Sequence, residues 1–144
     1  MASYPDFDPN DFIEGMTPAE YNEKYNIDTS PLFNRAISSK ATPGSIFKMV
    51  TALAGLEEGA VTLEEEIDDL GDFTKYDQTA YAPGCWTRYP QNHQDQNVTL
   101  ALTNSCNYYF YTVADRLGID NLNKWASLLG LTSKTGIELA GETT

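Results

Sequence analysis

The chain has 144 residues, of which 41% are hydrophobic and 12% aromatic, enough apolar material for one folded domain rather than a disordered segment. Its 9 basic and 21 acidic side chains give a formal net charge of −12, which argues against nucleic acid or anionic lipid as a partner, because both need a basic surface. No run approaches the about 20 apolar residues that span a bilayer.

The N-terminal part predicts little regular structure. Residues 3–16 are rich in proline, aspartate and asparagine, and they predict an extended arm. A short helix should follow, because Thr17 and Glu20 form a capping-box pattern. We expect this helix to end at about Tyr25 and residues 26–42 to be irregular.

A long helix is predicted from Ser45 to Glu58, since proline and glycine precede it and Gly59 provides a C-terminal stop. Ser45 and Lys48 are three residues apart, so they share a face of this helix and the hydroxyl can meet the amine. A serine hydroxyl is a weak nucleophile until a base takes its proton, and a lysine can be that base where burial lowers its pKa. The alternative is that Ser45 only caps the helix.

The middle of the chain lacks helical periodicity. Residues 67–97 contain several glycines and prolines and predict a long loop, with a small hairpin near residues 73–81. The acidic run at residues 64–72 lacks the ligand spacing of an EF-hand and predicts a solvated face. Three further helices are expected at residues 99–104, 107–117 and 122–129. The predicted fold class is therefore mainly α.

A second polar motif, Ser105-Cys106-Asn107, forms a predicted turn between two of these helices. It offers a second hydroxyl and a carboxamide, 60 residues after Ser45. An ordinary Ser/Asn turn is the alternative reading. If this turn and the Ser45–Lys48 helix face one cleft, their polar groups together suit acyl transfer through a serine ester.

Several phrases along the chain are typical of one family: Ala2-Ser3-Tyr4-Pro5, Phe7-Asp8-Pro9-Asn10, Asn34-Arg35-Ala36-Ile37, Pro43-Gly44-Ser45, Phe47-Lys48, Cys85-Trp86, Ser105-Cys106-Asn107, Tyr109-Phe110 and Thr135-Gly136-Ile137-Glu138-Leu139. With them, the chain resembles a class B penicillin-binding protein, the serine D,D-transpeptidase of peptidoglycan synthesis, over nearly its whole length. The resemblance implies that residues 1–144 are a single unit: an internal piece of the transpeptidase domain. This piece would be the helical subdomain of the α+β penicillin-binding/serine β-lactamase-like fold, with the flanking sheet strands absent.

The resemblance also implies roles for the two motifs, in a reaction that needs no cofactor. Ser45 would be acylated by a D-Ala-D-Ala stem peptide or by a β-lactam, with Lys48 as base. Ser105 would relay a proton to the leaving amine, and Asn107 would hold the substrate amide. The parent protein would be membrane-anchored at the extracytoplasmic face and would work with other cell-wall synthesis proteins.

Two other functions remain open from the sequence. One is a β-lactam sensor domain with the same acylation chemistry, and the other is a non-catalytic module whose pocket binds another protein. Lys134-Thr135-Gly136 matches the letters of the family's third motif, Lys-Thr/Ser-Gly on a strand, but it stands where the family has a loop phrase. We therefore expect Lys134 in a loop and the isolated chain to be nearly inactive.

The two cysteines and the only histidine form a separate candidate site. Cys85, His93 and Cys106 fall in or next to the predicted loop, and Asp69 or Asp72 lies nearby in the acidic run. Two thiolates, one imidazole and one carboxylate would complete a tetrahedral structural Zn²⁺ site. Free buried cysteines and a Cys85–Cys106 disulfide are the alternatives.

Overall fold

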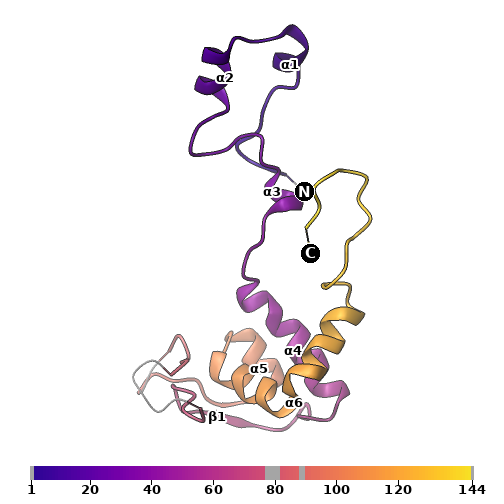
Figure 1. Cartoon of the computed structure of the whole chain (residues 1–144). Helices are drawn as coiled ribbons and strands as arrows, with labels where there is room; N and C mark the ends of the chain where they lie inside the picture. Colours follow the sequence, from indigo (N-terminus) through magenta and orange to yellow (C-terminus); the bar gives the residue numbers. More distant parts are fainter. Residues whose placement is uncertain (1, 77–81, 88–89, 144) are drawn as a thin grey trace. The chain divides into compact units, whose positions relative to one another are not determined.

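The computed structural model describes residues 2–76, 82–87 and 90–143 (Figure 1). In chain order the elements are α1 (Asn10–Glu14), α2 (Pro18–Lys24), α3 (Arg35–Ser38), the 3-10 helix η1 (Gly44–Phe47), α4 (Lys48–Glu57), β1 (Ile67–Asp69), β2 (Gln94–Gln96), α5 (Val98–Thr103) and α6 (Asn107–Leu128). The predicted mainly α fold class is confirmed. Within the described ranges, no helix is both long enough and apolar enough to cross a membrane.

The chain divides into two compact units, Met1–Ala41 with Ser133–Thr144, and Thr42–Thr132. The first unit holds α1, α2 and α3. Thr17 caps α2 and forms the predicted capping box with Glu20. The extended arm predicted over residues 3–16 is wrong in part, because α1 lies within it. Phe12 of α1 stacks on Tyr25 at 5.3 Å between ring centroids, a contact that local sequence preferences do not report.

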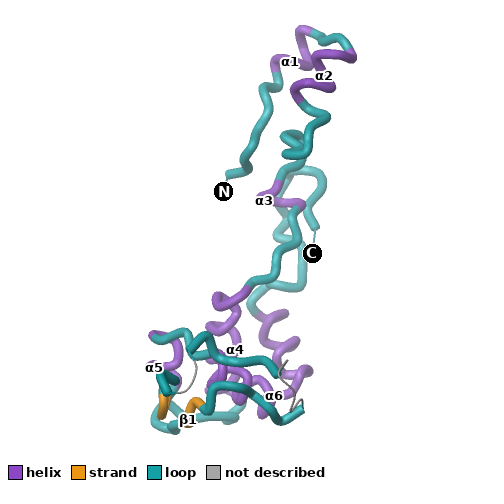
Figure 2. Tube along the Cα trace, turned by 90° about the vertical axis from the view of Figure 1, so that its left-hand side faces the viewer, coloured by secondary structure: helices purple, strands orange, loops and turns teal. Residues whose placement is uncertain are grey.

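The second unit is built on the packing of α4 against α6, with α5 beside them (Figures 1 and 2). Its core includes side chains from all three helices, among them Ala54, Ala101, Tyr109 and Val113, each fully buried. Gly55 of α4 lies against α6, since a Cβ added there would come within 2.7 Å of Cγ1 of Val113. This close packing places the start of α4 beside the start of α6.

The loop predicted over residues 67–97 contains a two-stranded sheet. β1 pairs antiparallel with β2, so that Ile67 lies opposite Gln96 and Asp69 opposite Gln94. Each strand has three residues, too few for an alternating pattern, and the pairing joins segments far apart in the chain. Of the hairpin predicted near residues 73–81, residues 77–81 lie outside the described residues.

The prediction that residues 26–42 are irregular is wrong in part, because α3 lies within them and is capped by Asn34, whose side chain accepts a hydrogen bond from the Ala36 amide. The other predicted helices are present and differ from the structure only at their ends. The helix predicted from Ser45 begins instead with the 3-10 turn η1, and α4 proper starts at Lys48. The two helices predicted at 107–117 and 122–129 form one element, α6, with a kink at Gly118. Gly118 has φ of 73°, a left-handed conformation that favours glycine, so the predicted break is confirmed.

Candidate active site

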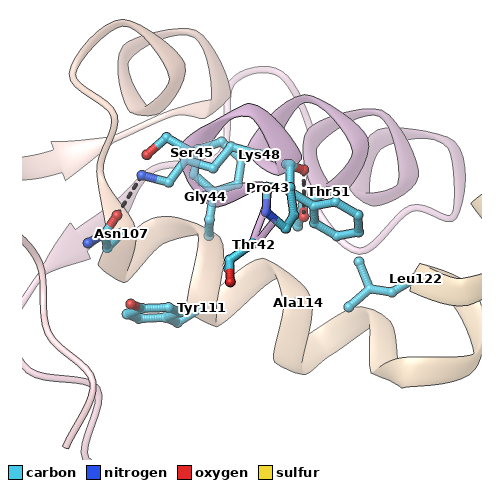
Figure 3. A pocket seen from close by; sticks show the side chains of 12 residues that line it. Thr42, Pro43, Gly44, Ser45, Lys48, Thr51, Asn107, Tyr111, Ala114 and Leu122 are labelled. Carbon is cyan, nitrogen blue, oxygen red and sulfur yellow. Dashed lines mark hydrogen bonds between the residues drawn. The ribbon is translucent and has the colours of Figure 1, made fainter. Parts of the chain in front are cut away.

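Ser45 and Lys48 meet the turn before α6. Ser105 Oγ donates a hydrogen bond to Ser45 Oγ at 3.1 Å, and Lys48 Nζ donates to Ser105 Oγ at 3.0 Å. Figure 3 shows Ser45 and Lys48 at the start of their helix and Asn107 at the start of α6. Two motifs 60 residues apart thus form one hydrogen-bonded chain, and the described contacts join Ser45 to Lys48 through Ser105.

The ammonium group of Lys48 has three acceptors in this turn. Besides Ser105 Oγ, these are the backbone oxygen of Ser105 at 2.7 Å and Oδ1 of Asn107 at 2.5 Å. A protonated lysine has three N–H bonds, so this set matches its full donor capacity. Asn107 is itself held, because its Nδ2 donates to the backbone oxygen of Gly84 at 3.2 Å.

A cavity of about 590 Å³ opens beside these groups. Its walls come from the segment around η1 and the start of α4 on one side and from α6 on the other (Figure 3). Ser45, Lys48 and Asn107 are its polar end, and the rest is lined mostly by apolar and aromatic side chains such as Tyr111 and Leu122, together with two threonines. A largely apolar cavity with a few polar groups at one end is typical of small-molecule sites.

Burial changes the acidity of Lys48. Desolvation lowers the pKa of this amine below its ordinary value, because the charged form loses water. Charge on the nearby thiols of Cys85 and Cys106 would act in the opposite direction. The net direction is toward a lysine that gives up its proton more easily, as a general base requires.

A second cluster lies on the other side of the same turn. One donor atom each from Asp69, Cys85, His93 and Cys106 lies within 4.8 Å of the other three. The two Sγ atoms are 3.9 Å apart, and His93 Nδ1 lies 3.4 Å from Cys85 Sγ and 3.0 Å from Asp69 Oδ2. Thiolates bound tetrahedrally to zinc at about 2.3 Å would be roughly 3.8 Å apart. The four residues could therefore hold a metal ion in tetrahedral geometry, and Asp69 rather than Asp72 is the carboxylate that lies in the group.

The protonation states of the side chains in this cluster also affect how it could bind a metal ion. Burial raises the pKa of the Cys106 thiol to about 12, so the free thiol keeps its proton at neutral pH. Burial alone would raise the pKa of Asp69, but hydrogen bonds from the Gly71 amide and from its three cluster neighbours hold it below its ordinary value. Both cysteines are free thiols, so the disulfide alternative is not the form observed. A bound cation would reverse the thiol preference, since a coordinating thiol is deprotonated.

A family model described as the penicillin binding protein transpeptidase domain matches residues 1–144. The chain belongs to this family. It is 35% identical to the peptidoglycan D,D-transpeptidase MrdA of Acinetobacter baumannii, covering 99% of this chain and 21% of the relative. It is also 35% identical to stage V sporulation protein D of Bacillus subtilis, covering 100% of this chain and 20% of the relative. The chain thus spans about a fifth of the length of the curated relatives it matches.

Solved structures of penicillin-binding proteins have the same fold. The crystal structure of Pseudomonas aeruginosa PBP2 in complex with WCK 5153 superposes with a TM-score of 0.89 at 33% identity, covering 99% of this chain and 32% of that one. The imipenem acyl-enzyme complex of penicillin-binding protein A from Mycobacterium tuberculosis superposes with a TM-score of 0.75 at 28% identity, covering 91% of this chain and 31% of that one. The chain is mostly helical with a two-stranded sheet, in agreement with the predicted helical part of a transpeptidase domain.

Lys134 of this penicillin-binding family member lies in a loop, as predicted. The sequence patterns assigned no role to three residues that are hydrogen-bonded to one another beside Ser105: Trp86, which appeared only in a family phrase, Gln96 and Asn104. The burial of Gln96 could be predicted only from its strand pairing, because a single glutamine in a polar stretch gives no periodic signal in the sequence.

Proposed function

We propose that the site performs the acyl transfer of a serine D,D-transpeptidase of peptidoglycan synthesis. The observation that carries this proposal is the hydrogen-bonded chain from Ser45 Oγ through Ser105 Oγ to Lys48 Nζ. Such a chain offers a nucleophile, a relay and a base within one cavity. The family membership and the names of the relatives support the same reaction class.

In the proposed reaction, a neutral Lys48 is the final proton acceptor. Ser45 Oγ bonds to the penultimate D-alanine carbonyl carbon of a stem peptide, while its proton passes to Ser105 and the Ser105 proton passes to Lys48. Hydroxyl hydrogens rotate, so the same oxygen positions serve either direction of donation. The bond to the terminal D-alanine then breaks, and its nitrogen takes the proton back along the same path. An amine of a second stem peptide attacks the resulting ester and frees Ser45.

Asn107 has a separate proposed role, to hold the amide of the substrate backbone beside Ser45. Its Oδ1 lies on Lys48 and its Nδ2 on the Gly84 carbonyl, so its orientation is fixed before substrate binds. A β-lactam would acylate Ser45 in the same way, because its strained amide occupies the position of the D-alanine bond. We propose that the whole protein acts on peptidoglycan at the extracytoplasmic face of a membrane, together with other cell-wall synthesis proteins.

Labelling with a fluorescent penicillin tests the proposal. We expect slow labelling of the 144-residue chain, well below one label per chain, at Ser45 as located by mass spectrometry. The reason is that neither described strand, β1 or β2, carries the Lys-Thr/Ser-Gly motif that the family resemblance implies, and loss of one oxyanion-hole donor costs about 10² to 10³ in rate.

Two variants provide the comparison. Ser45→Ala should abolish the labelling, and Ser39→Ala, at an exposed serine outside the cavity, should leave it unchanged. Labelling that persists in Ser45→Ala contradicts the proposed nucleophile. Fast, complete labelling of the unaltered chain at Ser45 contradicts only the expected low activity.

We further propose that Asp69, Cys85, His93 and Cys106 hold a structural Zn²⁺ ion. The support is the donor set, two thiols, one imidazole and one carboxylate, together with spacings that suit tetrahedral coordination. When bound, the ion would cross-link β1, the segment before β2 and the start of α6. The proposed acyl transfer does not pass through it.

Metal analysis tests the zinc proposal. We expect one zinc per chain, lost in His93→Ala, and a fall in unfolding free energy of about 2.7 kcal/mol where free zinc stands at 100 times its dissociation constant. The control is Asp68→Asn, at an exposed carboxylate in the same strand, which should keep the ion. Absence of stoichiometric zinc, with the same stability in His93→Ala, rules the site out.

A further inference from the structure

The turn that carries Ser105 has a backbone conformation that serine rarely adopts. Ser105 has φ of 52°, in the left-handed region where a side chain crowds the backbone. A residue other than glycine stays in this region only where its surroundings hold it there. The conformation matters because the same turn brings Ser105 Oγ within 3.1 Å of Ser45 Oγ.

The residue before Ser105 is held at two points. The indole Nε1 of Trp86 donates to the backbone oxygen of Asn104 at 3.1 Å, and Nδ2 of Asn104 donates to Oε1 of Gln96 at 2.9 Å. The backbone oxygen of Asn104 belongs to the peptide group that joins it to Ser105. A hydrogen bond to that oxygen therefore orients this peptide plane and restricts φ of Ser105.

Gln96 is a buried polar side chain, 3% exposed, and its amide is fully engaged. Its Nε2 donates to the backbone oxygens of His93 at 2.9 Å and of Asp95 at 2.8 Å. This leaves Oε1 for Asn104. A buried amide in a satisfied network is rigid, because any movement leaves a polar group without a partner.

We propose that Gln96 and Trp86 are positioning residues for the acyl transfer. They hold Asn104, and through it they keep Ser105 in the conformation that completes the path from Ser45 to Lys48. Neither has a described hydrogen bond to Ser45 or Lys48. Without them, Ser105 relaxes toward negative φ and its hydroxyl leaves the position between the nucleophile and the base. This inference rests on the proposed function.

Two matched pairs of variants of the 144-residue chain test the inference by NMR. Gln96→Met removes the buried amide, and its control Gln91→Met changes an exposed glutamine outside the network. Trp86→Phe removes the indole donor but keeps an aromatic ring, which is 67% exposed and lies 5.3 Å from the His93 ring, so it is expected to fold even if Gln96→Met does not. Its control is Trp125→Phe, which removes an indole bond to Glu58.

The readouts are the carbon chemical shifts of Ser105, which report φ, and hydrogen exchange of the Cys106 amide, which donates to the Ala101 carbonyl at 2.9 Å. We expect the amide to exchange about 10-fold faster in Gln96→Met and about 2- to 10-fold faster in Trp86→Phe. Exchange in α4 and in both controls should be unchanged. The slow penicillin labelling of Ser45 should fall along with the protection of the turn.

Unchanged Ser105 shifts and Cys106 exchange in Trp86→Phe and in any folded Gln96→Met overturn the inference. So does a loosened turn with an unchanged labelling rate, because the two residues would then serve stability alone. Labelling that survives Ser45→Ala overturns the proposed function instead. The two failures are distinguishable, because the chemical shifts and hydrogen exchange report only on the Ser105 turn.

Discussion

At the scale of single residues, the protonation of Lys48 controls the proposed chemistry. Three acceptors surround its Nζ, which suits the charged form, while burial lowers its pKa, which favours the neutral form. A general base must be neutral for part of the time, so the lowered pKa is what allows Lys48 to accept a proton from Ser105. The site is therefore expected to become more active as the pH rises.

The pH profile of Ser45 acylation tests this view of Lys48. A lowered pKa means that the amine loses its proton at a lower pH than a free lysine does. The rate should rise with pH and level off around an apparent pKa below 10.5, the ordinary value for lysine. In Lys48→Arg the guanidinium keeps its charge, so the rate should fall about 10²-fold or more and the rise should vanish. The control Lys40→Arg, at an exposed position, should leave the rate unchanged. A rate in Lys48→Arg equal to that of the unaltered chain would contradict the role of Lys48 as the base.

Several site residues could be predicted from the sequence, each for a physical reason. The spacing of Ser45 and Lys48 determines their shared helix face, and the Ser105 motif is recognisable as a turn between helices. The choice between Asp69 and Asp72 needed the structure, because it depends on which carboxylate the β1–β2 pairing turns toward the thiols. The support from Gln96 was not predictable, since nothing local shows that this glutamine is buried.

At the scale of elements, the packing of α4 on α6 depends on a glycine, Gly55, whose lack of a side chain lets the helices approach closely. Gly55 is buried, and an added Cβ would lie 2.7 Å from Val113 Cγ1 and 3.2 Å from Val61 Cγ2. Val113 is fully buried in α6, where valine has little rotamer freedom, and Val61 is buried as well, so neither neighbour yields easily. The absence of a side chain at residue 55 thus sets how near the two helices come.

Substitution at Gly55 tests this packing. In an open helix Gly→Ala stabilises by up to about 1 kcal/mol. Here we expect Gly55→Ala to lower the unfolding free energy by about 1–3 kcal/mol in urea titrations, because the methyl group overpacks the core. The double variant Gly55→Ala with Val113→Ala should lose less than the sum of the single losses. Added stability in Gly55→Ala contradicts the close packing.

The helices α2, α4, α5 and α6 were predictable because each carries caps, stops or a repeating apolar face within its own sequence, whereas α3, a single turn of four residues, was missed. The exceptions are instructive. α1 depends on Phe12 stacking on Tyr25, and the β1–β2 sheet pairs three-residue strands that are separated by the long middle segment. Both are contacts between distant parts of the sequence, so local preference does not reveal them.

At the scale of the whole molecule, one of the two compact units holds everything that the proposals need. The Thr42–Thr132 unit contains Ser45, Lys48, the Ser105 turn and the four residues of the proposed metal site. It also contains the hydrophobic core around α4, α5 and α6. The predicted single domain over residues 1–144 remains a prediction.

A shortened chain of residues 42–132 tests this unit. We expect it to unfold cooperatively, to keep the helical circular dichroism of α4–α6 and to bind one zinc, because its core and its four donors are all internal. Matching zinc content and a similar unfolding midpoint in the 144-residue chain would support the independence of the unit. A disordered product that binds no zinc contradicts it.

Cys106 stands between Ser105 and Asn107, yet its Sγ faces Asp69 and Cys85 while its two neighbours contact Lys48. The middle letter of Ser-x-Asn, which plays no part in the chemistry, is therefore tied to three partners elsewhere in the chain. In homologous proteins, the residues at positions 69, 85, 93 and 106 should be retained or replaced together. Loss of the thiol at position 106 would leave the other three side chains with an incomplete metal site. Serine and asparagine on either side would be inherited under a separate constraint.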